Sequence, residues 1–163
     1  MTDTGVSPIA EPVGIPQAFP AAYQAMLQLE RAMAGSALDR STYELVKLRA
    51  SQINGCGYCL DMHSKDARAM GETEARIYLL NAWREAPHYT RRERAALALT
   101  EAITLISHGH VPQEVEDEAR EVFDADEYAA LVFSIVTINA WNRLTITNHT
   151  SVGGYQPRQR ATA

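Results

Sequence analysis

STYELVKLRASQINGCGYCLDMHSKDARAMG, residues 41–71, carries both cysteines of the chain and its clearest helix boundaries. Ser41 with Glu44 three residues later has the form of a capping box, which predicts the start of a helix. The glycine-containing segment NGCG interrupts the helical pattern, and a second helix is predicted from about Tyr58 to Met70. The stretch therefore predicts two helices that meet at the cysteines.

The segments on either side of this stretch also have helical periodicity, and they predict five further helices. These span about 20–36, 73–86, 90–107, 111–123 and 124–147. No segment alternates polar and apolar residues as a half-buried β-strand does. The sequence therefore predicts an all-α fold, a single-domain helical bundle of about seven helices, without internal repeats.

The two ends of the chain differ from the helical part in composition. Three prolines within residues 1–16 predict an extended N-terminal leader. The polar, glycine-containing segment at 151–163 predicts a flexible C-terminal tail. The helical domain is accordingly predicted to span residues 17–150.

Composition and charge restrict the partners. The 163 residues carry a formal charge of -5, and no basic stripe interleaved with aromatic residues is present, so we expect no nucleic-acid partner. The N-terminal segment has no basic stretch followed by an apolar run, so a secretory signal is not expected. We therefore expect a cytoplasmic protein, where a Cys-x-x-Cys pair is more often catalytic or metal-binding than a permanent crosslink.

The most apolar stretch, residues 128–147, is interrupted by Asn139, Asn142 and Arg143. Polar side chains at these positions favour a buried helix over a membrane span, and no membrane partner is expected. The three polar residues are expected at a subunit contact in preference to a pocket. Trp141 in the same helix is interpreted as a core aromatic residue.

The Cys-x-x-Cys pair occupies a position where a thiolate is favoured. Residues one helical turn apart share a face, so Cys59 and His63 are expected to be neighbours, with Cys56 at the helix start. A helix N-terminus stabilises negative charge, and a nearby imidazole accepts a thiol proton. Such surroundings move a cysteine pKa from ~8.5 into a range of ~3.5–7.5. Redox chemistry is therefore the leading interpretation of the pair.

Other interpretations of the pair remain open. A structural zinc site requires four ligands, and only the two cysteines and His63 are local, although His108 and His110 could supply more. Haem attachment requires a histidine where Leu60 stands. Two inert buried thiols would be a third possibility, which the glycine-flanked helix start disfavours.

Glu44 also has two interpretations. It completes the Ser41 capping box, so its side chain could bond to its own helix start. If the two helices fold back as a hairpin at NGCG, Glu44 would instead lie near His63 and contact it directly or through water. Spacing alone does not separate these interpretations.

The arrangement Glu44, eleven residues, Cys56-x-x-Cys59, three residues, His63 resembles the alkylhydroperoxidase D-like (AhpD-like) branch of the carboxymuconolactone decarboxylase family. The resemblance extends over roughly residues 20–147. It implies an all-α bundle that assembles as a homotrimer or homohexamer and reduces hydroperoxides.

The resemblance also implies roles for the four residues. Cys59 would be the attacking thiolate and Cys56 the resolving thiol, and His63 with Glu44 would form a proton relay. No cofactor and no metal are implied. An external dithiol or thiol protein is expected as the reductant, and its identity is left open because Tyr58 stands where the well-studied family enzyme has a histidine.

Three other functions stay open at this point. A thiol–disulfide oxidoreductase or redox sensor would use the same cysteines. A metal-binding or assembly module would use them as ligands. A decarboxylase-like enzyme on a small organic acid would not need them.

Overall fold

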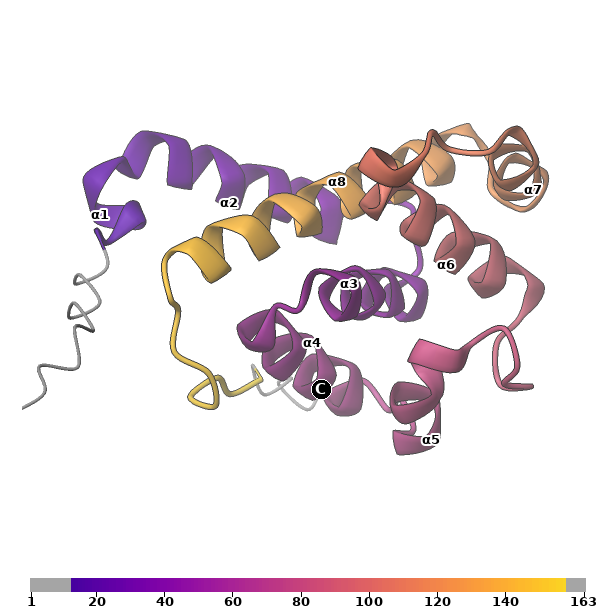
Figure 1. Ribbon diagram of the computed structural model, residues 1–163, viewed down its shortest axis with the longest axis horizontal. Helices are drawn as coiled ribbons and strands as arrows, with labels where there is room; N and C mark the ends of the chain where they lie inside the picture. Colours follow the sequence, from indigo (N-terminus) through magenta and orange to yellow (C-terminus); the bar gives the residue numbers. More distant parts are fainter. Residues whose placement is uncertain (1–12, 158–163) are drawn as a thin grey trace, which may run out of the picture.

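Eight α-helices and two short 3₁₀ helices make up the described part of the chain, residues 13–157, in the computed structural model (Figure 1). The α-helices are α1 (Ile15–Ala18), α2 (Pro20–Ala34), α3 (Arg40–Asn54), α4 (Gly57–Ala69), α5 (Glu74–Tyr78), α6 (Arg91–Thr104), α7 (Gln113–Val122) and α8 (Ala125–Thr147). The 3₁₀ helices are η1 (Leu79–Ala82) and η2 (Ile106–His108). Residues 13–157 contain no β-strand, so the predicted all-α class is confirmed.

The centre of the fold is α3, which packs against α4, α6 and α8 (Figure 1). Seven consecutive residues, 42–48, are buried, so this helix has no broad solvent face. Tyr43 and Val46 pack with apolar side chains of α6, α7 and α8. Leu45 and Leu48 pack into a second cluster with Leu80 and with apolar residues of α4 and α6. Both clusters position α3 beside the start of α4, where the cysteines lie.

The helix count and one helix differ from the prediction. About seven helices were predicted, and α1 is an additional one. The prediction of a single helix over 73–86 is wrong. The chain is α-helical only to Tyr78 and then continues as η1 and turns. The buried side chains here are Leu80, Trp83, Ala86 and Tyr89. Spacings of three residues align side chains in a 3₁₀ helix, so burial of this row favours the tighter turn.

The start of α3 corrects the predicted capping box. Asp39 is the N-cap, and its side chain accepts a hydrogen bond from the Thr42 amide at 2.9 Å. The Ser41 hydroxyl instead donates to Glu72 at 3.3 Å. Glu44 is therefore not a capping residue, because an aspartate two residues before Ser41 already satisfies the helix start.

The polar residues of α8 bind within the chain. Asn54 at the end of α3 donates to the side-chain oxygens of Asn139 and Asn142, at 2.9 and 2.8 Å. Asn142 is fully buried and donates to Ser51 at 3.0 Å. These contacts join α8 to α3 within one chain, and the subunit contact expected for these residues stays a prediction.

The length and composition of α8 alone would permit it to cross a membrane, with a mean hydropathy of 1.3 over its most apolar window. Of that window, 39% is buried within the fold. The helix packs on α2, α3, α4 and α6.

The ends of the described chain carry more structure than predicted. Residues 1–12 and 158–163 lie outside the described residues. The short helix α1 begins inside the leader that was predicted to be extended. The predicted loose tail is attached at its start, because Lys65 of α4 donates to the Tyr155 carbonyl at 3.0 Å. The Tyr155 hydroxyl in turn donates to Asp66 of α4 at 2.8 Å.

Candidate active site

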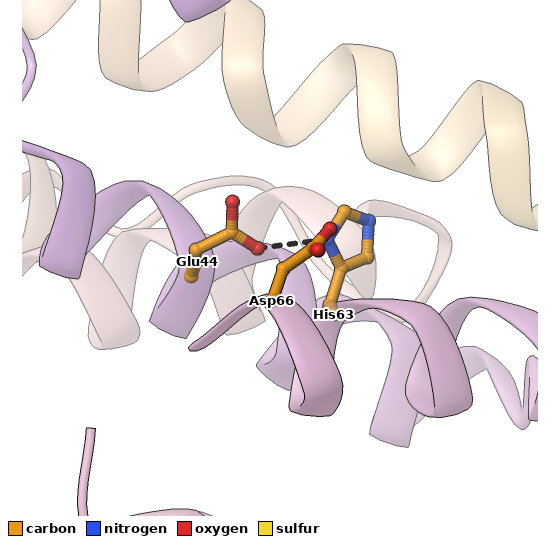
Figure 2. A group of neighbouring side chains, drawn as sticks. All are labelled: Glu44, His63 and Asp66. Carbon is orange, nitrogen blue, oxygen red and sulfur yellow. Dashed lines mark hydrogen bonds and ion pairs between the residues drawn. The ribbon is translucent and has the colours of Figure 1, made fainter. Parts of the chain in front are cut away.

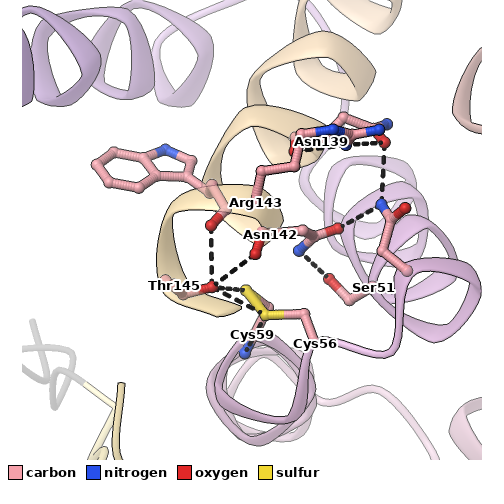
Figure 3. Close-up of a disulfide and its surroundings, with 9 residues drawn as sticks. Ser51, Cys56, Cys59, Asn139, Asn142, Arg143 and Thr145 are labelled. Carbon is pink, nitrogen blue, oxygen red and sulfur yellow. Dashed lines mark hydrogen bonds between the residues drawn. A yellow bond between two sulfur atoms is a disulfide. The ribbon is translucent and has the colours of Figure 1, made fainter. Parts of the chain in front are cut away.

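The two cysteines lie where α3 ends and α4 begins. Gly55 ends α3 in the left-handed region, with φ of 69°, a conformation that glycine adopts without a steric penalty. Cys56 follows as the N-cap of α4, and its sulfur accepts from the Cys59 amide at 3.3 Å. A disulfide joins Cys56 and Cys59, whose Cα atoms are 5.4 Å apart (Figure 3). The predicted placement of the pair at a helix start is confirmed.

Thr145 near the end of α8 contacts both sulfurs. Its Oγ1 is 3.1 Å from Cys56 Sγ and 3.4 Å from Cys59 Sγ (Figure 3). The same hydroxyl lies 2.9 Å from the Trp141 carbonyl oxygen, one turn earlier in α8. The disulfide therefore has a hydroxyl group from a distant part of the chain beside it.

Glu44 and His63 form a buried pair. Glu44 projects from α3 and His63 from α4, and His63 Nδ1 is 2.8 Å from Glu44 Oε2 (Figure 2). Both residues are below 5% exposed. Arg40 binds the other carboxylate oxygen of Glu44 at 3.4 Å. The predicted hairpin, with Glu44 directly beside His63, is confirmed, whereas the catalytic roles of the four residues stay predictions.

Asp66 extends this group by one turn of α4 (Figure 2). Burial and the hydrogen bond to Asp66 raise the pKa of Tyr155 to about 12, so its phenol remains a donor to this carboxylate. One ligand atom each of Glu44, His63 and Asp66 lies within 4.8 Å of the others, a spacing that could hold a metal ion. This set shares only His63 with the zinc ligands considered from the sequence.

The cysteines in their oxidised form are bonded to each other, and His108 and His110 are exposed in the segment after α6. Glu44 and Asp66 already accept hydrogen bonds from His63 and Tyr155. The two carboxylates therefore already have hydrogen-bond partners within the chain.

A cavity of about 440 Å³ adjoins these residues. Its apolar wall comes from α2, α4 and α8 and includes Tyr23, Leu27, Tyr58, Met62, Ile138 and Leu144. Its charged and titratable residues are Glu30, Arg40, Glu44, Lys47, His63 and Asp66. Of the two cysteines, Cys59 lines the cavity, so a small molecule there would meet Cys59.

Glu30 of α2 is the centre of a second polar group in the cavity. It accepts from Tyr43 at 2.5 Å, from Trp141 Nε1 at 3.1 Å and from the ammonium of Lys47. Burial alone would raise the pKa of Glu30, but Lys47 and the hydrogen bond from Tyr43 bring it below its ordinary value. Burial lowers the pKa of Lys47, and Glu30 partly offsets this effect. The group joins α2 to α3 and α8.

Sequence reasoning missed several cavity residues. Arg40 and Lys47 lie four residues before and three after Glu44, so helical spacing alone could have placed them on its face. Glu30 and Thr145 have no such local signal, because they reach the site only through the packing of α2 and α8.

The model of the carboxymuconolactone decarboxylase family matches residues 17–102, which is more than half of the chain and includes the four predicted site residues. The chain belongs to the carboxymuconolactone decarboxylase family. The match covers α2, α3, α4 and α5 and most of α6, the elements that supply Glu30, Lys47 and the cysteines. The cavity residues outside the matched segment are Ile15 and Pro16 of α1, those of α8, and Asn148 and Thr150 after it.

Relatives of this family member include YdfG, an uncharacterized protein of Bacillus subtilis, with 48% identity over 127 residues that cover 78% of this chain and 86% of YdfG. A solved structure from Agrobacterium tumefaciens is 35% identical, with a TM-score of 0.84 and coverage of 90% of this chain and all of that one. That protein has unknown function and is provisionally assigned as the antioxidant defence protein AhpD. The AhpD-like resemblance is confirmed.

A shorter match links this family member to a named enzyme. Over 34 residues it is 50% identical to the alkyl hydroperoxide reductase AhpD of Bradyrhizobium diazoefficiens, covering 21% of this chain and 19% of that protein.

Proposed function

We propose that this protein is a thiol-dependent hydroperoxide reductase that removes peroxides in the cytoplasm. The observation that carries the proposal is the position of Cys59, which lines a cavity together with the Glu44–His63 pair and forms a disulfide with Cys56. A peroxide in this cavity would meet a nucleophile, a proton carrier and a resolving thiol. The resemblance to AhpD supports the same reaction.

The reaction begins with attack of the Cys59 thiolate on the distal peroxide oxygen. A sulfur–oxygen bond forms, the oxygen–oxygen bond breaks, and the alcohol leaves after it gains a proton. Cys59 is then a sulfenic acid. The Cys56 sulfur attacks Cys59, the sulfur–oxygen bond breaks, and water leaves as the disulfide forms. An external dithiol reduces the disulfide by exchange and completes the cycle.

The Glu44–His63 pair is suited to carry the proton in the first step. A carboxylate that accepts from Nδ1 fixes the tautomer with the proton on Nδ1, which leaves Nε2 free to take up and return a proton. Nε2 points away from Glu44 (Figure 2). Arg40 holds the other carboxylate oxygen, so Glu44 is oriented by its second contact. We assign His63 as the proton carrier and Glu44 as the residue that orients it.

The cavity also favours certain substrates. Its apolar wall suits an organic hydroperoxide. Its carboxylates, on Glu30, Glu44 and Asp66, outnumber its cations, Arg40 and Lys47, which leaves a net charge of -1 when His63 is neutral. An organic acid substrate, as a decarboxylase would require, meets this unfavourable charge.

A thiol–disulfide oxidoreductase is the second candidate, because it would use the same disulfide. Cys56 and Cys59 are each only 1% exposed, which favours a small peroxide over attack on a folded protein disulfide. The reductant, an external dithiol or thiol protein, must reach the same sulfurs. We further propose a homotrimer or homohexamer as the working assembly.

The experiment that tests the peroxidase counts thiols. The reduced protein, freed of reductant and of metal, is titrated before and after one equivalent of cumene hydroperoxide. We expect two accessible thiols per denatured chain to fall to none and to return on addition of dithiothreitol. In the matched variant Cys56→Ser, we expect a sulfenic acid at Cys59 that dimedone traps.

Two thiols that persist after prolonged exposure to peroxide would exclude the peroxidase. The rate with a protein disulfide would then be measured, because a rate far above that with peroxide is the sign of the second candidate. Activity on an organic acid that survives replacement of both cysteines would point to decarboxylase-like chemistry instead.

A further inference from the structure

The hydroxyl of Thr145 lies between the two sulfurs of the site and has no role in the reaction described so far. Its oxygen is 3.1 Å from Cys56 Sγ and 3.4 Å from Cys59 Sγ, and Figure 3 shows it bridging the pair. We propose that Thr145 is a catalytic residue, which stabilises the Cys59 thiolate and carries the proton of Cys56 to the leaving oxygen. The proposal rests on the peroxidase function and adds a residue to it.

The position of Thr145 is fixed by the surrounding structure. Asn142, three residues earlier in α8, is fully buried and bonds to Ser51 and Asn54 of α3. These contacts hold this turn of α8 against the end of α3, directly before Cys56. The Thr145 side chain is therefore held beside the sulfurs by a polar network that no other part of the reaction uses.

In the oxidised protein the Thr145 hydrogen has a better acceptor than sulfur. The Trp141 carbonyl oxygen lies 2.9 Å from Oγ1, and a neutral sulfur accepts hydrogen bonds only weakly. Reduction replaces the disulfide by a thiolate, which is a charged acceptor and forms a stronger hydrogen bond. The hydroxyl is then expected to turn from Trp141 to Cys59, which lowers the pKa of the Cys59 thiol.

The same hydroxyl can serve the second step. The Cys56 thiol donates its hydrogen to Thr145 Oγ1, and the Thr145 hydroxyl donates its own hydrogen to the oxygen of the Cys59 sulfenic acid. The Cys56–Cys59 bond forms, the sulfur–oxygen bond of Cys59 breaks, and water leaves with the proton delivered through Thr145. No oxidant beyond the hydroperoxide is needed, and Thr145 ends in its starting protonation state.

A purely structural role for Thr145 makes different predictions. Threonine in a helix often bonds to the carbonyl oxygen four residues earlier without further function. In that case valine, which has the same shape, would leave the thiol chemistry unchanged. Thr145→Val removes the hydroxyl and Thr145→Ser retains it, so the two variants form a matched pair.

The first measurement follows the Cys59 thiol in a Cys56→Ser background. The rate of alkylation by iodoacetamide is recorded against pH for Thr145, Thr145→Val and Thr145→Ser proteins. We expect valine to raise the midpoint of this profile by about one pH unit, the size of one charge-assisted hydrogen bond, and serine to restore it. A midpoint for valine equal to that for threonine would overturn the thiolate role.

The second measurement follows the sulfenic acid with both cysteines present. After one equivalent of cumene hydroperoxide, dimedone competes with Cys56 for Cys59. We expect Thr145→Val to increase the trapped fraction by about tenfold, because disulfide formation slows, and Thr145→Ser to keep it low. Equal trapping in the valine and threonine proteins would overturn the proton-carrying role.

The alkylation and trapping measurements distinguish a failure of the Thr145 proposal from a failure of the proposed peroxidase function. If the Cys56→Ser protein forms no sulfenic acid with cumene hydroperoxide, the peroxidase fails, and the alkylation profile still reports on Thr145. Circular dichroism of each reduced variant verifies the fold, and Thr145→Ala replaces the valine variant if valine does not fold.

Discussion

The two ends of the cavity are built differently. At the sulfur end, the Cys56–Cys59 disulfide receives long, weak contacts of 3.1–3.4 Å to sulfur, from the Thr145 hydroxyl and the Cys59 amide. At the other end, three donors from α3 and α8 converge on the Glu30 carboxylate, and one of them is a buried ammonium. The first end has groups that can rearrange during a reaction, whereas the second has groups that are fully bonded to each other.

This difference between the two ends indicates that one supports the chemistry and the other the stability of the fold. No residue of α2 is fully buried, so we expect the Glu30 contacts to contribute much of what holds α2 against α3 and α8. The disulfide, by contrast, closes only a three-residue separation within one turn and constrains little of the unfolded chain. We therefore expect activity to depend on the sulfur end and stability to depend on the Glu30 end.

The largest expected effect is on activity, from Cys59→Ser. Without the thiolate no sulfenic acid can form, so peroxide consumption should fall by at least about 10³-fold. Single-turnover peroxide assays measure this loss, and thermal unfolding of the reduced proteins serves as the control. A Cys59→Ser protein that still consumes peroxide would contradict the expectation that activity depends on the sulfur end of the cavity.

Glu30→Ala tests the opposite end. The variant leaves the Lys47 ammonium buried without its partner, which should lower the free energy of unfolding by about 3 kcal/mol. This value is near the lower limit for a broken buried pair, because Glu30 is partly exposed. Thermal or urea unfolding measures the loss. The double variant Glu30→Gln/Lys47→Met, which removes both charges, should recover most of it, and an unchanged stability of Glu30→Ala would show that α2 is held by other contacts.

His63→Gln tests the residue between the two ends. Glutamine can donate to Glu44 but cannot carry a proton, so oxidation of Cys59 by peroxide should slow by about 10²-fold. Stopped-flow assays across pH measure this step. An unchanged rate and pH profile would remove His63 from the relay, and unfolding of the variant should differ less from wild type than that of Glu30→Ala.

The smallest expected effect is a pH dependence of stability. The pKa of Glu30 is lower in the folded protein than in the unfolded chain, so its contribution is present above the unfolded pKa of about 4.5 and is lost as pH falls through the folded value. The difference in unfolding free energy between wild type and Glu30→Gln should therefore shrink as the solution is acidified, and a constant difference from pH 7 to pH 3 would contradict the assignment.

The sequence predicted those parts of the fold and site that depend on local spacing. Cys59 and His63 are one turn apart on α4, and a break at NGCG brings Glu44 back beside them. Contacts between distant segments were not predictable in this way. Glu30 and Thr145 lie 26 or more residues from the cysteines and meet the site through α2 and α8.

Two predictions from local sequence were wrong: the capping box of Ser41 and the single helix over 73–86. Asp39 caps α3 in place of Ser41, which frees Glu44 for His63. After Tyr78 the chain continues as η1 and turns, with buried side chains three residues apart, where an α-helix was predicted.

Trp141 gives the protein a built-in optical signal. Its ring packs against the cluster that holds both sulfurs, meets Tyr23 edge-on at 5.4 Å and bonds to Glu30. Trp83, the other tryptophan, lies in a separate cluster with Leu80. Because a disulfide quenches nearby indole emission by accepting an electron from the excited ring, reduction should brighten Trp141 and leave Trp83 as an internal reference. The oxidation state of the site can thus be followed by fluorescence, without a label.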